Sequence, residues 1–270
     1  LIGSYTTNFA SSSAGRAKNV ITGVSKVDGT ILYPGEEFDL AKTVSPFTQE
    51  NGYELAGAYQ NGTVVESFGG GICQVATTLY NAVIRAELEI TMRFNHSMLV
   101  HYVEPSMDAA IAGNYKDLKF KNNLDAPVYI EGYCSGGIIY FNVYGKETRP
   151  SNREISFESE TVSKTDPKVQ FTMDASLTAG SVSVTQSGQS GCIAQLWKIV
   201  KVDGKQQSRD LFNKSNYQAT PKLITIGTKD ATSETLSALK AAIATGDEAK
   251  VRSAAADLKT NAQKKEEEQK

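Results

Sequence analysis

Residues 66–80 read ESFGGGICQVATTLY, a glycine triplet followed by a run with helical periodicity. Apolar positions after the triplet recur every three or four residues, which predicts a helix that continues to about Leu88. Three consecutive glycines allow positive φ angles and let the backbone approach a neighbouring segment closely. This stretch therefore predicts a tight turn that ends where a helix begins, with Cys73 in the first helical turn.

The position of Cys73 has chemical consequences. A thiol in the first turn lies beside backbone amides without helical partners and at the positive end of the helix dipole, and both effects favour the thiolate. The amides of this turn, with Gly70, Gly71 and Gln74 around them, are candidates to hold an oxyanion. A cysteine near a helix start is also often a small buried apolar residue, and a glycine triplet by itself marks only a turn. Both interpretations stay open on spacing alone.

A thiol nucleophile usually needs a base, and the sequence contains only two histidines, His96 and His101. Both follow the predicted helix, so a returning strand would bring His96 alongside Cys73. We expect a strand over residues 99–103, where alternation points His101 away from the face of its neighbours. His96 is therefore the preferred base, although by itself it also fits a hydrogen-bonded structural histidine.

Composition narrows the class of protein. The 270 residues are 40% hydrophobic and 21% charged, which excludes wholesale disorder. A net charge of -2 argues against a nucleic-acid partner, and no apolar run approaches the ~18–20 residues of a transmembrane segment. The three cysteines and two histidines predict no zinc site, no other metal and no cofactor. The chain starts at Leu1 without a leader pattern, so we expect its targeting segment to lie outside this sequence.

Periodicity divides the chain into three zones and predicts an α+β fold. Residues 1–148 mix a helix at 12–26, the helix after the triplet, and antiparallel strands. Residues 152–229 alternate Ser, Thr and Val and predict a small all-β module, with a hairpin turn at Asp203-Gly204. Residues 230–270 predict a helical hairpin whose second helix is capped by Thr245 and Glu248, followed by a polar tail that frays. In the first zone, the strands are expected at residues 99–103, 118–120, 128–133 and 138–144.

The first zone resembles a known family. Residues 69–82, GGGICQVATTLYNA, are similar to the signature of the VanW domain, named for a component of some vancomycin-resistance clusters. The likeness continues in order over about residues 1–147 and includes RFNHS at 93–97 and DAA at 108–110. The second zone resembles a G-five domain, most clearly in its closing run at residues 221–229.

The resemblance implies an extracellular or surface-attached protein of the bacterial envelope. Its implied activity is that of a peptidoglycan L,D-transpeptidase, which forms 3–3 cross-links through a thioester. Carried over, Cys73 would be the nucleophile, His96 the base, and Asp108 and Tyr102 the orienting groups, while the family does not favour histidine at position 101. The implied partners are peptidoglycan stem peptides and wall glycans. The alternative is a non-catalytic wall-binding accessory protein linked to glycopeptide resistance, in which Cys73 only packs the helix start.

Overall fold

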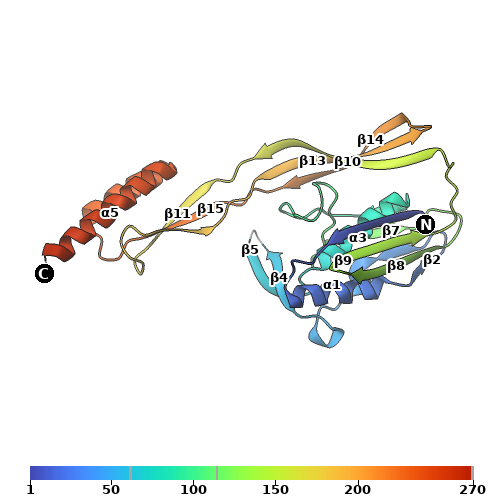
Figure 1. The fold of residues 1–270 in the computed structure, drawn as a ribbon, viewed down its shortest axis with the longest axis horizontal. Coiled ribbons are helices and arrows are strands. Elements are labelled where there is room, and N and C mark those ends of the chain that lie inside the picture. Colours follow the sequence, from blue (N-terminus) through green and yellow to red (C-terminus); the bar gives the residue numbers. More distant parts are fainter. Residues whose placement is uncertain (61–62, 114, 269–270) are drawn as a thin grey trace. The chain divides into compact units, whose positions relative to one another are not determined.

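The computed structural model describes residues 1–60, 63–113 and 115–268 (Figure 1). The described chain divides into two compact units, one formed by residues 1–163 with 192–217 and the other by 164–191 with 218–270. Helices and mostly antiparallel sheets in the first unit, and a sheet with two C-terminal helices in the second, confirm the α+β class. The domain boundaries expected from sequence remain a prediction, because the spatial units divide the β-rich zone differently.

The first unit contains most of the elements. In chain order they are β1 (Gly3–Asn8), α1 (Ala14–Val27), β2 (Thr30–Leu32), β3 (Glu37–Asp39), α2 (Leu40–Val44), a 3-10 turn (Gln49–Asn51), β4 (Leu55–Gln60), β5 (Thr63–Phe68), α3 (Ile72–Arg85), β6 (Glu89–Met92), β7 (Lys119–Lys121), β8 (Val128–Ser135), β9 (Ile138–Tyr144), β10 (Arg153–Thr165), β13 (Gly191–Val202) and β14 (Lys205–Tyr217). The two predicted helices are confirmed as α1 and α3, and three of the predicted strands as β7, β8 and β9.

The scaffold of this unit is a four-stranded antiparallel sheet in the order β1-β9-β8-β2 (Figure 1). The period-two alternation of a strand separates its faces. Ile139, Phe141 and Val143 of β9 are fully buried, while Tyr144 on the same strand is exposed. Helices α1 and α3 pack against the sheet and against each other. The buried face of the sheet thus fixes both helices, and with them the glycine turn that precedes α3.

Helix α3 is the centre of the core. Every residue from Gln74 to Ile84 is buried, including polar side chains, so this helix is enclosed rather than amphipathic. Strand β1 approaches it so closely that a Cβ at Gly3 would lie 2.5 Å from the carbonyl oxygen of Ala82. The hydroxyls of Thr7 in β1 and Thr78 in α3 form a hydrogen bond of 2.7 Å. An enclosed helix has little freedom to shift, which gives the residues on its first turn a fixed frame.

The strand predicted at residues 99–103 is wrong. The chain between β6 and β7 is irregular there, and β6 and β7 pair with each other instead. A strand needs a neighbour for its amides. Farther along this connection the backbone is held by side chains of α3, since Thr77 bonds both backbone groups of Ala109 and Asn81 donates to the carbonyl of Met107. The described residues of this connection, 93–113 and 115–117, form a loop that is hydrogen-bonded to α3.

The second unit has its own sheet and core. Its elements are β11 (Val169–Asp174), β12 (Val182–Gln186), β15 (Lys222–Gly227), α4 (Ser233–Ala244) and α5 (Glu248–Glu268). Strand β15 lies between a parallel β11 and an antiparallel β12. Residues of β15 and both helices, with Ala179 from the connection before β12, form a separate apolar cluster: Ala179, Ile224, Ile226, Leu239, Val251, Ala255 and Leu258.

Two predictions for the C-terminal helices need correction. Thr245 does not cap α5; it closes α4, and Asp247 accepts the amides of Ala249 and Lys250 in the first turn of α5. Asp is as good a cap as Thr and stands immediately before the first helical residue. The tail expected to fray from Lys264 instead continues α5 to Glu268, and the last two residues lie outside the described chain.

The hairpin turn predicted at Asp203-Gly204 is confirmed between β13 and β14. Among the helices of the described residues, none has the length and apolar character needed to cross a membrane.

Candidate active site

Cys73 is the second residue of α3, after a turn that only glycine accommodates. Gly71 has a φ of 111° and caps the helix without a side-chain bond. A Cβ at Gly70 would lie 2.6 Å from the carbonyl oxygen of Ala56. Asn19 fixes the turn from α1, since its side-chain amide donates to the carbonyls of Gly70 and Glu54. The triplet thus lets β4 and α1 hold Cys73 at the positive end of the helix dipole.

The structure brings Cys73, His96 and Asp108 together. His96 Nδ1 lies 2.6 Å from Asp108 Oδ2, and the same oxygen accepts the His96 backbone amide at 2.7 Å. The His96 ring also lies close enough to the Cys73 thiol for hydrogen bonding and charge to lower the pKa of that thiol. With Nδ1 occupied by the carboxylate, Nε2 is the nitrogen left for sulfur. The thiol, which is partly buried, also lies 3.4 Å from the carbonyl oxygen of Ile111.

The ionisation of the three groups is linked. Burial by itself raises the pKa of Cys73, but the hydrogen bond and positive charge of His96 outweigh it, so this pKa lies below the ordinary thiol value. Burial lowers the pKa of His96, but the bonds to Asp108 and Cys73 raise it to about 9. Burial raises the pKa of Asp108, while His96 and Arg93 lower it overall. The arrangement therefore favours a thiolate beside an imidazolium that a carboxylate orients.

The thiol of Cys134 lacks this environment. Cys134 on β8 is also partly buried, yet burial alone raises its pKa to about 11. A thiol of that kind is largely protonated near neutrality and reacts slowly. The contrast indicates that His96, and not burial, lowers the pKa of Cys73.

Arg93 holds the Asp108 carboxylate at its second oxygen, the one that does not contact His96. Its side chain is 8% exposed, and its guanidinium donates to Asp108 Oδ1 at 2.9 Å and to the Ser215 hydroxyl at 2.9 Å. The hydroxyl of Tyr217 donates to the same Asp108 oxygen. Sequence reasoning placed Arg93 in the RFNHS motif of residues 93–97 but gave it no role. Ser215 and Tyr217 were missed, because no local pattern connects strand residues to a site more than one hundred positions earlier in the chain.

The remaining predicted residues play different parts. Gln74 is buried, and its side chain bonds Thr7, the carbonyl of Asn8 and Arg16, so both of its donor hydrogens have acceptors. The Gln74 side chain therefore holds the start of α3 against β1 and α1, and it has no N–H left to donate to an oxyanion. Among the described residues, by contrast, nothing accepts the backbone amide of Cys73. That amide is the better candidate for holding negative charge.

Tyr102 lies near the sulfur, as its electrostatic coupling to Cys73 shows. Burial, with a contribution from the Cys73 charge, raises its pKa well above the ordinary tyrosine value, so its hydroxyl keeps its proton. The nearby Thr77 hydroxyl acts in the opposite direction on this pKa, but with a smaller effect. His101, one residue earlier, is exposed. The loop therefore turns His96 and Tyr102 toward the thiol and leaves His101 outside.

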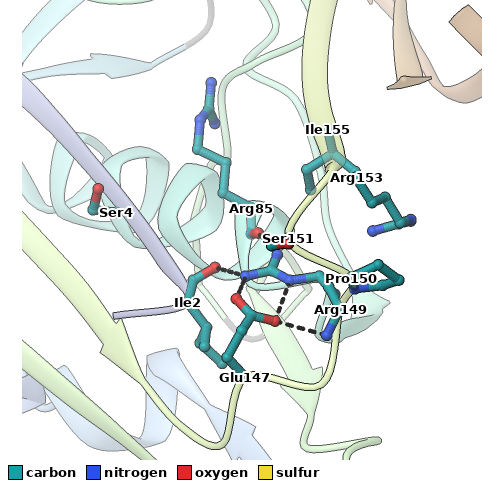
Figure 2. Close-up of a pocket in the computed structure, with 9 residues that line it drawn as sticks. All are labelled: Ile2, Ser4, Arg85, Glu147, Arg149, Pro150, Ser151, Arg153 and Ile155. Carbon is teal, nitrogen blue, oxygen red and sulfur yellow. Dashed lines mark hydrogen bonds and ion pairs between the residues drawn. The ribbon is translucent and has the colours of Figure 1, made fainter. Parts of the chain in front are cut away.

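A cavity of about 380 Å³ lies elsewhere, at the other end of α3 (Figure 2). Arg85 in its wall lies about 18 Å farther along the helix than Cys73, at 1.5 Å per residue. Figure 2 shows the guanidinium of Arg149 bonded to Glu147 and to the carbonyl oxygen of Ile2. Because the guanidinium of Arg149 is bonded within the protein, we interpret this cavity as structural. No group of three or more His, Cys, Asp or Glu in the described residues could hold a metal ion.

Residues 15–144 match the family described as VanW like protein, and residues 157–229 match the G5 domain. The resemblances drawn from sequence are therefore confirmed.

Two curated relatives share the first region. "Uncharacterized protein YoaR" of Bacillus subtilis is 35% identical over 54% of this chain and 48% of its own length. "Vancomycin B-type resistance protein VanW" of Enterococcus faecalis is 26% identical over 42% of each. The chain thus spans less than half the length of these relatives. A solved "IgA1 Protease G5 domain structure" shares 26% identity, covers 29% of this chain and 94% of its own, and has a TM-score of 0.20, too low for a structural argument.

Proposed function

Since the chain carries a VanW-like domain followed by a G5 domain, we propose that it acts on the bacterial cell wall as a cysteine L,D-transpeptidase. Its substrates would be peptidoglycan stem peptides, and its G5 region would contact wall glycans. A protein with these substrates would work outside the cell, in the envelope. One relative is, by its printed name, a vancomycin resistance protein, which agrees with a role in wall chemistry.

The observation that carries the proposal is the Cys73–His96–Asp108 arrangement at a helix start. A thiolate, a histidine whose second ring nitrogen is held by a carboxylate, and an amide without an acceptor are the parts that acyl transfer needs. His96 Nδ1 and Asp108 Oδ2 are 2.6 Å apart, and Asp108 is 1% exposed, so the histidine is oriented by a carboxylate shielded from water.

The chemistry follows from these parts. The Cys73 thiolate attacks the carbonyl carbon between diaminopimelate and the terminal D-alanine of a stem tetrapeptide. The Cys73 amide lies where it can hold the oxyanion that forms. As the C–N bond breaks, His96 gives its proton to the leaving amine, D-alanine departs and a thioester remains. The amine of a neighbouring stem then attacks the thioester and transfers a proton to His96 while the thiolate is released.

The experiment is incubation of the protein with disaccharide tetrapeptides, followed by mass spectrometry for cross-linked dimers and free D-alanine. We expect both products from the unchanged protein and neither from Cys73→Ala. The matched control is Cys134→Ala, whose thiol lies in β8 and should leave the yield unchanged. Equal yields from the unchanged protein and Cys73→Ala would end the proposal. Wall binding without either product would favour the accessory-protein alternative, in which the thiol is not catalytic.

A further inference from the structure

Strand β14, which lies in the G5 region, reaches the candidate site. Tyr217 at its end is 3% exposed, and its hydroxyl donates to Asp108 Oδ1 while accepting the backbone amide of Ser106 at 2.7 Å. Asp108 therefore has two anchors on Oδ1, Tyr217 and Arg93, and presents Oδ2 to His96.

Two further side chains of the same strand belong to this contact. Residues 213, 215 and 217 alternate along β14, so they share one face. Ser215 is 2% exposed and accepts Arg93 Nη1 at 2.9 Å. Asn213 donates to the Tyr80 hydroxyl at 2.7 Å. The strand therefore bonds the carboxylate, the arginine and helix α3 from one side.

We propose that β14 is part of the catalytic apparatus: Tyr217 is a positioning residue that fixes the rotation of the Asp108 carboxylate, and thereby sets how strongly His96 stabilises the Cys73 thiolate. The inference rests on the proposed function of Cys73. It also means that the working site extends beyond residues 15–144, the region that matches the VanW-like family.

The physical reason is the geometry of the carboxylate. With both anchors on Oδ1, rotation about the Cβ–Cγ bond would break two buried hydrogen bonds, so Oδ2 stays in line with His96 Nδ1. Burial and the neighbouring carboxylate raise the pKa of Tyr217, so its hydroxyl keeps the proton it donates. Without that donor, Arg93 alone holds Oδ1, the carboxylate can turn, and the imidazolium loses part of its support.

The test measures how alkylation of Cys73 by iodoacetamide depends on pH in the full chain, read at the Cys73 peptide by mass spectrometry. For Tyr217→Phe we expect the midpoint of ionisation to rise by about one unit, which slows alkylation about tenfold below both midpoints. The matched control is Tyr144→Phe, which removes a hydroxyl from an exposed tyrosine of β9 and should leave the midpoint unchanged.

A purely structural role would lower the melting temperature of Tyr217→Phe and leave the midpoint where it was, and that result would overturn the inference. A fall in the midpoint would overturn it as well. Should Tyr217→Phe fail to fold, Ser215→Ala decides, because it weakens the Arg93 anchor while keeping the tyrosine; we expect a smaller rise, and no rise counts against the inference. An ordinary thiol midpoint in the unchanged protein would instead refute the proposed function itself.

Discussion

At the scale of single residues, the charge on Asp108 is what makes His96 a strong base. Burial lowers the pKa of His96, and the carboxylate and thiol reverse this and bring it to about 9. A pKa raised on folding stabilises the folded state fully below the unfolded value near 6.5, and this stabilisation is lost as pH rises through about 9. The histidine thus stabilises the fold under the same conditions in which it supports the thiolate.

We predict that Asp108→Asn lowers the pKa of His96 by more than about one unit, because the amide keeps the shape of the carboxylate but not its charge. The measurement is an NMR titration of the histidine rings. The sequence contains only one other histidine, His101, which is exposed and serves as the reference signal. An unchanged titration of His96 would show that Asp108 is not its electrostatic partner.

Sequence reasoning reached part of this residue-level arrangement. Cys73 was found from its glycine turn, and His96 from being one of two possible bases. Asp108 came only with the family resemblance. Tyr217 and Ser215 were beyond reach, because their bonds to Asp108 and Arg93 join positions more than one hundred residues apart. Such contacts depend on how β14 crosses the loop, which no local periodicity encodes.

At the scale of elements, the start of α3 depends on the conformation of Gly71. Its φ of 111° is costly for a residue with a side chain, and a Cβ there would lie 3.0 Å from Arg16 Cγ. We predict that Gly71→Ala destabilises the protein by about 2 kcal/mol and lowers the melting temperature by about 5 °C. The measurement is thermal unfolding followed by circular dichroism.

The matched control for this change is Gly29→Ala. Gly29 also has a positive φ, 82°, but a Cβ there would meet no atom within 4 Å. It should therefore show the backbone cost alone and a smaller loss of stability. Equal losses at Gly71 and Gly29 would contradict the idea that packing around the glycine turn adds to the strain.

The other end of α3 is held by charge. Arg153 of β10 donates two hydrogen bonds to Glu87, at 2.6 and 2.8 Å, and these lower the pKa of Glu87 to about 2 against the opposite effect of burial. Lys198 of β13 bonds the same carboxylate. A carboxyl pKa depressed on folding stabilises the folded state above its unfolded value of about 4.5, and the stabilisation is lost as pH falls toward 2.

We therefore predict that the free energy of unfolding of the first unit falls between about pH 5 and pH 2, by up to about 3 kcal/mol from Glu87. In Glu87→Gln this part of the slope should be absent, since the amide does not titrate. Urea unfolding at several pH values measures it. An equally steep slope in the variant would assign the acid sensitivity to other carboxyl groups.

The elements themselves were predictable where packing follows periodicity. Helices α1 and α3 and the β8–β9 hairpin repeat their apolar residues at the spacing that the core requires, so the sequence pattern and the structure agree. The strand expected at 99–103 failed because a strand is defined by its neighbour, and this loop bonds side chains of α3 instead. The cap at Asp247 was missed because Thr245, another good capping residue, lies only two positions earlier.

At the scale of the whole molecule, the region matching the VanW-like family is not a closed structural unit. The compact first unit adds residues 192–217 to the N-terminal part. Leu196 of β13 is a fully buried member of the main core, and Phe157 of β10 and Phe212 of β14 pack against it. These strands contribute apolar contacts as well as the polar contacts of Tyr217.

A chain truncated after residue 150 should therefore be less stable than the full chain and should lose the low pKa of Cys73. Removing a buried leucine alone typically costs about 2–5 kcal/mol, and the truncation also leaves Arg93 and Ser106 without their partners on β14. Thermal unfolding and the pH dependence of Cys73 alkylation, compared between the fragment and the full chain, provide the test. If the fragment melts at the same temperature and keeps a reactive thiol, residues 15–144 form a self-sufficient site and the G5 strands serve only to bind the wall.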